Sequence, residues 1–291
     1  MNRWLWTVTV AGAVSAASGC ASAGTMQADP AHAGGEAASG PASVTSLTSS
    51  NGDFLYTKVL TAPKALELHG INGNVHAVGA ASTTAEVRAA KRITHGDPAS
   101  QRVVVYEYDG GVVVCALVAS QPDDDCRPGD DALYAGRHKG GNNDDLSFDF
   151  DVRVPSGVPF TVRTMNGNID AKELQSELRV LTMNGEVAVQ TTGHPLLAKT
   201  MNGRIFAPLT AAPTVPVQLE SKNGPVELHV PAGSDFDLVA STMHGEIVSD
   251  FPISTSSSGP GPAQAQGKVG RGGTRVALKT MNGDIVVKRG P

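Results

Sequence analysis

The sequence is poor in aromatic residues and lacks the motifs that reveal many enzymes and nucleic-acid-binding proteins. Of 291 residues, two are tryptophan, and both Trp4 and Trp6 lie in the leader described below, so a mature chain has none to stack on a sugar ring. The net charge of -5, without a cluster of basic residues, excludes the electrostatic footprint of nucleic-acid binding. The eight histidines form no H-E-x-x-H motif, and no serine or cysteine nucleophile signature is present. These absences favour a non-catalytic protein without cofactor or metal.

Long hydrophobic runs are also missing. The apolar run 4–17, which follows Arg3, is too short to cross a bilayer and is typical of an export signal. Two modes of processing are open. Small residues precede Cys20, as in a bacterial lipoprotein signal over 1–20, although leucine usually stands where Ala17 is found. The alternative is cleavage after Ala23, which would discard Cys20.

We expect lipidation at Cys20 because a tether follows it. Residues 21–50 are nearly all Ala, Gly, Ser, Thr and Pro, so they cannot bury enough apolar surface to become ordered. A flexible chain of that length spans about 30 Å, which suits a spacer between membrane and domain. Because Ala21 is not an inner-membrane retention residue, we expect an outer-membrane lipoprotein, with a periplasmic or secreted protein as the alternative.

Cysteine is scarce as well. Three cysteines are present, and if Cys20 carries the lipid, Cys115 and Cys126 remain. In an exported protein such a pair indicates a disulfide, with two buried thiols as the alternative. Zinc is not expected, because two further ligands are not evident nearby.

What the sequence does contain is a repeated phrase, T-M-N-G, with the variants S-K-N-G, T-M-H-G and G-I-N-G. From the second copy to the last, the steps are 18, 18, 21, 21 and 38 residues. A period near 20 residues is the mark of a solenoid. His244 replaces asparagine in one copy, and the seven positions are Asn72–Gly73, Asn166–Gly167, Asn184–Gly185, Asn202–Gly203, Asn223–Gly224, His244–Gly245 and Asn282–Gly283.

The residues around each copy alternate as strands do. Two residues before the Thr or Ser and two after the Gly stand apolar residues such as Val180 and Val187, which we expect in the core. The pattern predicts an all-β solenoid resembling a parallel β-helix, with 18–21 residues per coil. Continuing the alternation places Thr164, Thr182 and Thr200 inward, and the Asn side chains inward after them, where they can form a hydrogen-bonded ladder.

The phrase itself is predicted to be a corner. Asn-Gly favours left-handed backbone and therefore a tight turn between two strands. His244 is an acceptable replacement, because histidine is enriched at positive φ.

The methionines of the phrase are harder to interpret. Simple alternation points them outward, in the same column as Lys222. They could cover the edge of the core where the corner twists, form an apolar stripe for a partner, or provide thioether ligands for Cu(I). The column consists of Met165, Met183, Met201, Met243 and Met281.

The repeats belong to a single predicted β-repeat domain, 51–291. Its first part, 51–150, contains a predicted β-hairpin around Asp109-Gly110. The acidic segment 121–145 lacks the ordered spacing of a calcium loop, so a solvated loop is preferred to a calcium site.

The second part of the domain, 151–291, carries the solenoid repeats. It is interrupted by the low-complexity insert 252–273, which we predict to be a disordered excursion from one coil.

Together, the T-x-N-G-x-[IV] repeats and the V-P-x-G entries at Val154–Gly157 and Val230–Gly233 resemble the bacterial putative-adhesin family over about 60–291. The resemblance implies a β-solenoid on an exported, often membrane-attached protein. Adhesion is suggested by the family's name and is not an established activity.

The leading functional hypothesis is therefore a non-catalytic module, anchored to the cell envelope by its lipid, that presents a stiff β-solenoid to an envelope protein or polymer. A polysaccharide-acting β-helix enzyme and an envelope-stress accessory protein are the alternatives.

Overall fold

The fold is taken from a computed structural model that describes residues 43–45, 53–129, 145–257 and 262–290. The chain divides into a unit Met1–Glu36 and a unit Ala37–Pro291, and the described residues all belong to the second. Cys20 and the predicted leader lie outside the described residues, as does most of the predicted tether. Among the described residues, no helix is long and apolar enough to cross a membrane.

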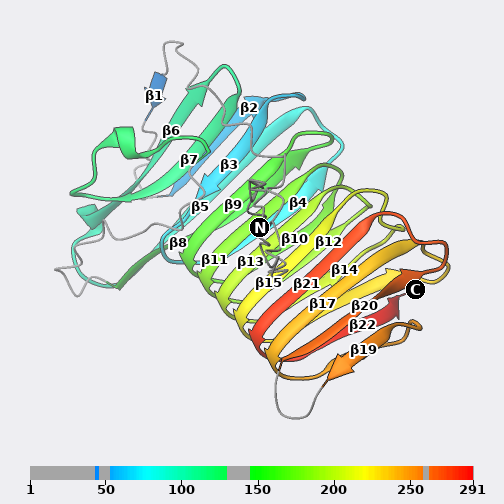
Figure 1. The fold of residues 1–291 in the computed structure, drawn as a ribbon. Coiled ribbons are helices and arrows are strands. Elements are labelled where there is room, and N and C mark those ends of the chain that lie inside the picture. The colour runs from blue at the N-terminus through cyan, green and yellow to red at the C-terminus, as the bar shows by residue number, and fades with distance from the viewer. Residues whose placement is uncertain (1–42, 46–52, 130–144, 258–261, 291) are drawn as a thin grey trace, which may run out of the picture. The chain divides into compact units, whose positions relative to one another are not determined.

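The second unit is a stack of coils, each made of one strand from each of two sheets (Figure 1). This confirms the predicted all-β, solenoid-like fold. The larger sheet, sheet A, has twelve strands, in the order β1 (Ser43–Thr45), β6 (Gln101–Tyr108), β7 (Gly111–Val118), β3 (Ala65–His69), β9 (Phe160–Asn166), β11 (Leu178–Asn184), β13 (Leu196–Asn202), β15 (Val217–Asn223), β21 (Arg275–Asn282), β17 (Phe236–His244), β20 (Ala263–Val269) and β19 (Ser254–Ser257).

The second sheet, sheet B, runs alongside it and supplies the other half of each coil. Its ten strands are, in order, β2 (Phe54–Val59), β5 (Thr84–His95), β8 (Asp145–Pro155), β4 (Val75–Ala80), β10 (Ile169–Leu174), β12 (Val187–Thr191), β14 (Ile205–Pro208), β16 (Val226–Pro231), β22 (Ile285–Gly290) and β18 (Ile247–Ser249).

One hydrophobic core runs between the two sheets. In β9, Phe160 and Val162 point inward, and Ile169 and Ala171 of β10 face them from sheet B; all four are buried. The predicted inward threonines, among them Thr182, are buried in the same way. Because each coil exposes apolar residues at its two open sides, burial depends on the neighbouring coils.

Equivalent residues of adjacent coils lie in register. Leu178 of β11 pairs with Phe160 of β9 on one side and with Leu196 of β13 on the other. The parallel register continues through both sheets, so each repeat position forms a row along the stack.

The coils are not stacked in chain order at the C-terminal end. The last coil, β21 and β22, lies between the coil β15–β16 and the coil β17–β18. β21 pairs in parallel with both β15 and β17. The sequence gives no direct sign of this order, because every coil carries the same alternation and the same phrase or a close variant of it.

The prediction that the insert 252–273 is disordered is wrong for much of this segment. Residues 252–273 contain β19 and β20, which pair with each other and, through β20, with β17, all antiparallel. In β20, Ala263 and Ala265 are buried while the intervening Gln264 is exposed. The alternation is therefore present in "AQAQ", although it uses small residues in place of large ones.

The N-terminal end contains the predicted hairpin, formed by β6 and β7 around Asp109-Gly110. β7 continues sheet A beside β3, and β8 continues sheet B beside β4, both in parallel. Antiparallel β5 and β2 complete sheet B at this end. Two short 3-10 turns, Pro98–Ser100 and Asp123–Asp125, lie in the connections.

Candidate functional site

The repeated phrase separates into residues that hold the coils together and one residue that does not. From Thr182 onward, the threonine or serine hydroxyl of each copy donates to the carbonyl oxygen of the phrase glycine in an adjacent coil, whereas Thr164 donates to the carbonyl oxygen of Ile71. Examples are Thr200 to Gly185 at 3.2 Å and Ser221 to Gly203 at 3.0 Å. This contact satisfies a carbonyl at the corner, where the ladder of the strands ends.

The asparagines form the predicted ladder. Asn184 Nδ2 donates to Asn166 Oδ1 at 2.8 Å, and Asn202 Nδ2 donates to Asn184 Oδ1 at the same distance. The chain of bonds continues to Asn223 and Asn282, in the spatial order of the coils. The ladder differs from the expectation in one respect: the Asn side chains lie at the surface, because the corner turns them away from the core.

The glycines are required by close approach between coils. A Cβ on Gly185 would overlap the carbonyl oxygen of Gly167, and the same holds along most of the column. Gly185 has φ +158. The prediction of a left-handed asparagine is wrong: among the described residues, Glu173 is the one non-glycine residue with positive φ. A left-handed backbone is therefore not the reason that histidine is accepted at position 244. His244 ends β17 and lies opposite Asn282 of β21.

The methionine is the member of the phrase with no such bond. Met165, Met183, Met201 and Met281 are half-buried, and the side chain of Met243 is 46% exposed. Met165 packs against the core, so this residue partly covers its edge, as one interpretation expects. Lys222 takes the same place in β15 and is exposed, so the fold does not require an apolar residue there.

The methionine row borders an outward-facing row on sheet A. Leu181 of β11 is buried although it faces outward, and Leu197 of β13, one row further on, is half-buried. In the same outward-facing row as Leu181, the carboxylate of Glu220 forms two ion pairs, with Lys199 Nζ at 3.6 Å and with Lys279 Nζ at 3.4 Å. We call the methionine row together with Leu181 and Leu197 the Met face. It is an apolar strip, interrupted by Lys222 on β15, with a border of alternating charges.

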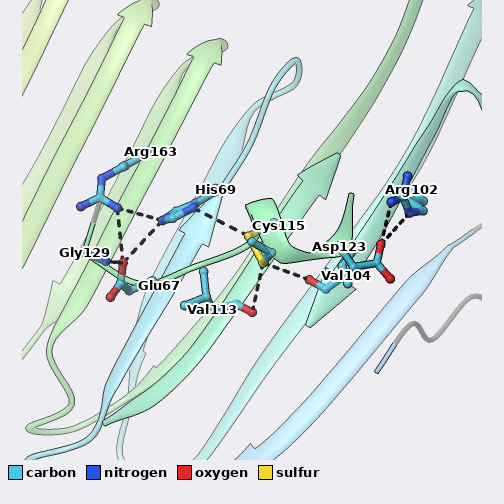
Figure 2. The surroundings of a disulfide bond; sticks show 10 residues. Glu67, His69, Arg102, Val104, Val113, Cys115, Asp123, Gly129 and Arg163 are labelled. Atoms are coloured by element: carbon cyan, nitrogen blue, oxygen red, sulfur yellow. Dashed lines mark hydrogen bonds and ion pairs between the residues drawn. A yellow bond between two sulfur atoms is a disulfide. The ribbon is translucent and has the colours of Figure 1, made fainter. Parts of the chain in front are cut away.

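At the N-terminal end of the same outer face lies a buried cluster of charged residues that the sequence did not single out. Glu67 and His69 project from β3, and Arg163 projects from β9 beside them (Figure 2). Arg163 Nη1 is 3.3 Å from Glu67 Oε2 and 2.9 Å from His69 Nε2, which is itself 3.4 Å from Glu67 Oε2. All three are buried.

The carboxyl of Glu67 is held in its charged form. Burial alone would raise its pKa, but the hydrogen bond from His69, the charges of His69 and Arg163, and the backbone N–H of Gly129 together lower it. Tyr108 also approaches Glu67 Oε1, at 3.5 Å, and burial with that carboxylate raises the pKa of Tyr108 to about 12.

A disulfide fastens the segment that covers this cluster. Cys115 on β7 is bonded to Cys126, as predicted, and Cys115 Sγ lies 3.7 Å from His69 Nδ1 (Figure 2). Both cysteines are buried in a small hydrophobic cluster with Val104, Val113 and Leu117 on the outer face of sheet A.

A second attachment holds the same segment. Arg102 of β6 donates to the backbone oxygen of Gln121 and to the carboxylate of Asp123, each at 2.6 Å. The first part of the predicted acidic loop, 121–129, is thus folded onto the sheet and not free in solvent. Residues 130–144 of that loop lie outside the described residues, and its last residue, Asp145, begins β8.

On the outer face of sheet B, strands β4, β5 and β8 border a shallow cleft of about 370 Å³. Across its floor Glu86 stands opposite Arg153, and Arg88 stands opposite Asp151. Gly79 lines the cleft, and the backbone of Glu173, at a bulge in β10 with φ +57, packs against it. The charges of this cleft are arranged to pair with one another.

No group of three potential metal ligands among His, Cys, Asp and Glu occurs in the described part of the chain. The methionines of the Met face are spread one to a coil along sheet A. A Cu(I) site therefore receives no support from their arrangement, because soft-metal sites gather several sulfur ligands around one ion.

Comparison with known proteins adds little on function. No family model matches the sequence, and no curated protein matches it. Two solved structures show a distant structural similarity to this chain. A putative cell adhesion protein from Clostridium sporogenes has a TM-score of 0.43 at 13% identity, over 82% of this chain and all of that chain. A putative adhesin from Bacteroides fragilis has a TM-score of 0.31 at 11% identity, over 83% of this chain and 99% of that one.

Proposed function

We propose that this chain is a non-catalytic, adhesin-like binding module of the cell envelope and that the Met face is its contact surface. The observation that carries the proposal is that the residues of the phrase differ in what they contribute to the coil stack. Thr and Asn bond to the adjacent coil and Gly allows its close approach, whereas Met repeats in five copies with no hydrogen bond to a neighbouring coil and is replaced by Lys222 in a sixth. A repeated apolar side chain that the fold does not require calls for a role outside the fold.

The chemistry of methionine suits such a surface. Its unbranched, polarisable side chain adapts to irregular partners, and apolar strips rimmed by polar groups commonly mark interaction sites. Rows of identical side chains in adjacent coils favour an extended partner, such as a strand-like protein segment or a polymer that runs along the stack.

Anchoring to the envelope is the second part of the proposal. It rests on the export signal and on Cys20 with its following tether, and the disulfide is typical of proteins that fold outside the cytoplasm. Mass spectrometry of the mature N-terminus tests it. A diacylglyceryl group on Cys20 is expected, and a free N-terminus at Gly24 would contradict the anchor.

The test of the Met face compares two variants of the mature protein. Met183→Glu combined with Met201→Glu places two carboxylates on the strip, and Leu55→Glu combined with Val59→Glu places two at exposed positions of β2, at the N-terminal end of sheet B. We expect the first variant to lose at least tenfold in binding of the labelled protein to envelope preparations from the producing cell. The second should bind as the parent does. Equal binding by both variants would overturn the assignment of the surface, provided that both melt cooperatively.

A further inference from the structure

The outer face of sheet B carries a second group of charged and aromatic residues. It consists of Arg204, Phe206, Glu227, His229 and Lys288, and we call it the Glu227 cluster. They lie on three adjacent strands. Phe206 is in β14 and Arg204 directly precedes that strand, Glu227 and His229 are in β16, and Lys288 is in β22.

Three basic side chains converge on one carboxylate. Glu227 Oε1 accepts from His229 Nε2 at 2.7 Å and from Lys288 Nζ at 3.1 Å, while Arg204 Nη2 donates to Oε2. The side chain of Glu227 is 16% exposed, whereas those of Arg204 and Lys288 are 43% and 50% exposed. The anion therefore lies at the base of the cluster and the cations lie at its rim.

The carboxyl of Glu227 is held in its charged form. Burial would raise its pKa, but the hydrogen bonds from His229, Lys288 and Arg204 outweigh it and lower the pKa to about 2. One carboxylate cannot use all the donors around it. A guanidinium has five N–H groups and an ammonium has three. With a single negative charge against Arg204 and Lys288, the cluster is cationic even when His229 is neutral.

An aromatic surface adjoins these donors. The Arg204 guanidinium lies over the Phe206 ring, 5.0 Å from its centroid, and the His229 imidazole meets the same ring edge-on at 5.1 Å. Phe206 is half-buried on the outer face, so part of the ring is presented to solvent. Aromatic and cationic groups are thus combined within one patch, on a flat sheet.

We propose that the Glu227 cluster binds a carboxylate-bearing sugar unit of an acidic polysaccharide. The carboxylate pairs with the rim donors of Arg204 and Lys288, and the apolar face of the pyranose ring packs on Phe206 and His229. Charge-assisted bonds to a planar carboxylate suit a guanidinium in particular. The site lies on the face opposite the Met face, so it extends the proposed binding function to a second surface without depending on it.

The test uses the mature protein and two defined probes, polygalacturonate as the acidic polysaccharide and dextran as the neutral one. Binding is measured by affinity electrophoresis and by calorimetry at fixed ionic strength. We expect polygalacturonate to bind and dextran not to bind. Arg204→Gln combined with Lys288→Gln should weaken polygalacturonate binding at least tenfold.

A matched control separates a site from general charge attraction. Lys199→Gln combined with Lys279→Gln removes the same two charges from sheet A, and it should change polygalacturonate binding less than twofold. Phe206→Leu keeps an apolar side chain but removes the ring, and it should still weaken polygalacturonate binding several-fold. An unchanged melting temperature would show that the fold is kept.

The contrary outcomes are equally defined. No binding of polygalacturonate, or equal losses in the two double variants, would overturn the site. If polyglutamate binds as tightly as polygalacturonate, the assignment of a sugar is overturned. If polyphosphate binds as tightly, the assignment of a carboxylate is overturned. Loss of Met-face binding in the earlier experiment leaves these results unchanged, so the two proposals fail separately.

Discussion

At the scale of single residues, the phrase T-M-N-G is a set of contacts between coils. The threonine hydroxyl satisfies a glycine carbonyl, the asparagine amide continues a ladder, and the glycine allows the backbones to approach. Since each of these contacts points along the stack, a substitution in one coil is felt by its neighbours.

Gly185→Ala tests the close approach. An added Cβ would overlap the Gly167 carbonyl oxygen, so the coils must move apart, at a cost of about 1–3 kcal/mol or more in unfolding free energy. Gly233→Ala is the matched control, because Gly233 has φ +81 with nothing within 4 Å of a new Cβ. Its cost should be that of left-handed backbone alone, about 1–2 kcal/mol. Chemical denaturation of both variants decides, and a Gly185 variant as stable as the parent would contradict the explanation.

Acid stability should depend on Glu67. Its pKa is lowered in the folded protein, so its contribution is complete above its ordinary value of 4.5 and is lost as the pH falls through the lower, folded-state value. We expect the free energy of unfolding to fall more steeply below about pH 4.5 in the parent than in Glu67→Gln. Denaturant titrations between pH 3 and pH 7 measure this. Parallel curves would show that the cluster contributes nothing to acid sensitivity, and Glu177→Gln at an exposed corner controls for the substitution itself.

Many of the inward and outward positions could be predicted from the sequence, and each position that was predicted wrongly or missed has a physical reason. Alternation alone placed Thr164, Thr182 and Thr200 inside, where the structure has them. Alternation failed at the asparagines, because the strand leaves its pleat as it enters the corner. The cluster of Glu67 and Arg163 was missed because the two residues are far apart in sequence and become neighbours through register alone.

At the scale of elements, strands with large apolar residues were predicted and strands with small ones were not. The β6–β7 hairpin has a clear turn between two valine-rich runs, whereas β20 buries two alanines. A segment that buries little side chain has a weak pattern, and its pairing is decided by the sheet edge that receives it. For β20 that edge is β17, which would otherwise be open.

The disulfide acts on one element, the segment that covers the Glu67 cluster. Cys126→Ser should lower the free energy of unfolding by about 2–3 kcal/mol, the effect expected for a short loop. Hydrogen exchange should rise around Gly129, whose N–H bonds to Glu67, and stay unchanged in the middle coils. Faster exchange throughout the stack would show that the disulfide supports the whole solenoid and not this segment. Cys115→Ser is the companion variant and should give the same pattern.

At the scale of the whole unit, the order of coils is the feature that sequence periodicity could not supply. Periodicity fixes what each coil looks like, but identical coils fit beside one another in any order. In the structure β21–β22 lies between β15–β16 and β17–β18, and the connection that leads to it pairs through β20 with the far side of β17.

Leu278→Ala tests this order. Leu278 is buried in β21 between Leu219 of β15 and Ala240 of β17, so its truncation should cost about 2–5 kcal/mol. Hydrogen exchange should increase in both β15 and β17, although these strands precede β21 in the chain. Val189→Ala in β12 is the control and should loosen β10 and β14 instead. Increased exchange in β17 alone would contradict the inserted position.

The inserted coil also bears on the order in which the protein can be completed during synthesis. Because the chain emerges from its N-terminus onward, in synthesis and in export, β15–β16 and β17–β18 are available well before the strands that separate them. Until Arg275–Gly290 has been made, neither flank has its final neighbour, so a prematurely ended chain keeps an unfilled gap within both sheets. The molecule thereby makes Arg275–Gly290 a condition for its final architecture, and a product that lacks this segment would remain open to proteolysis.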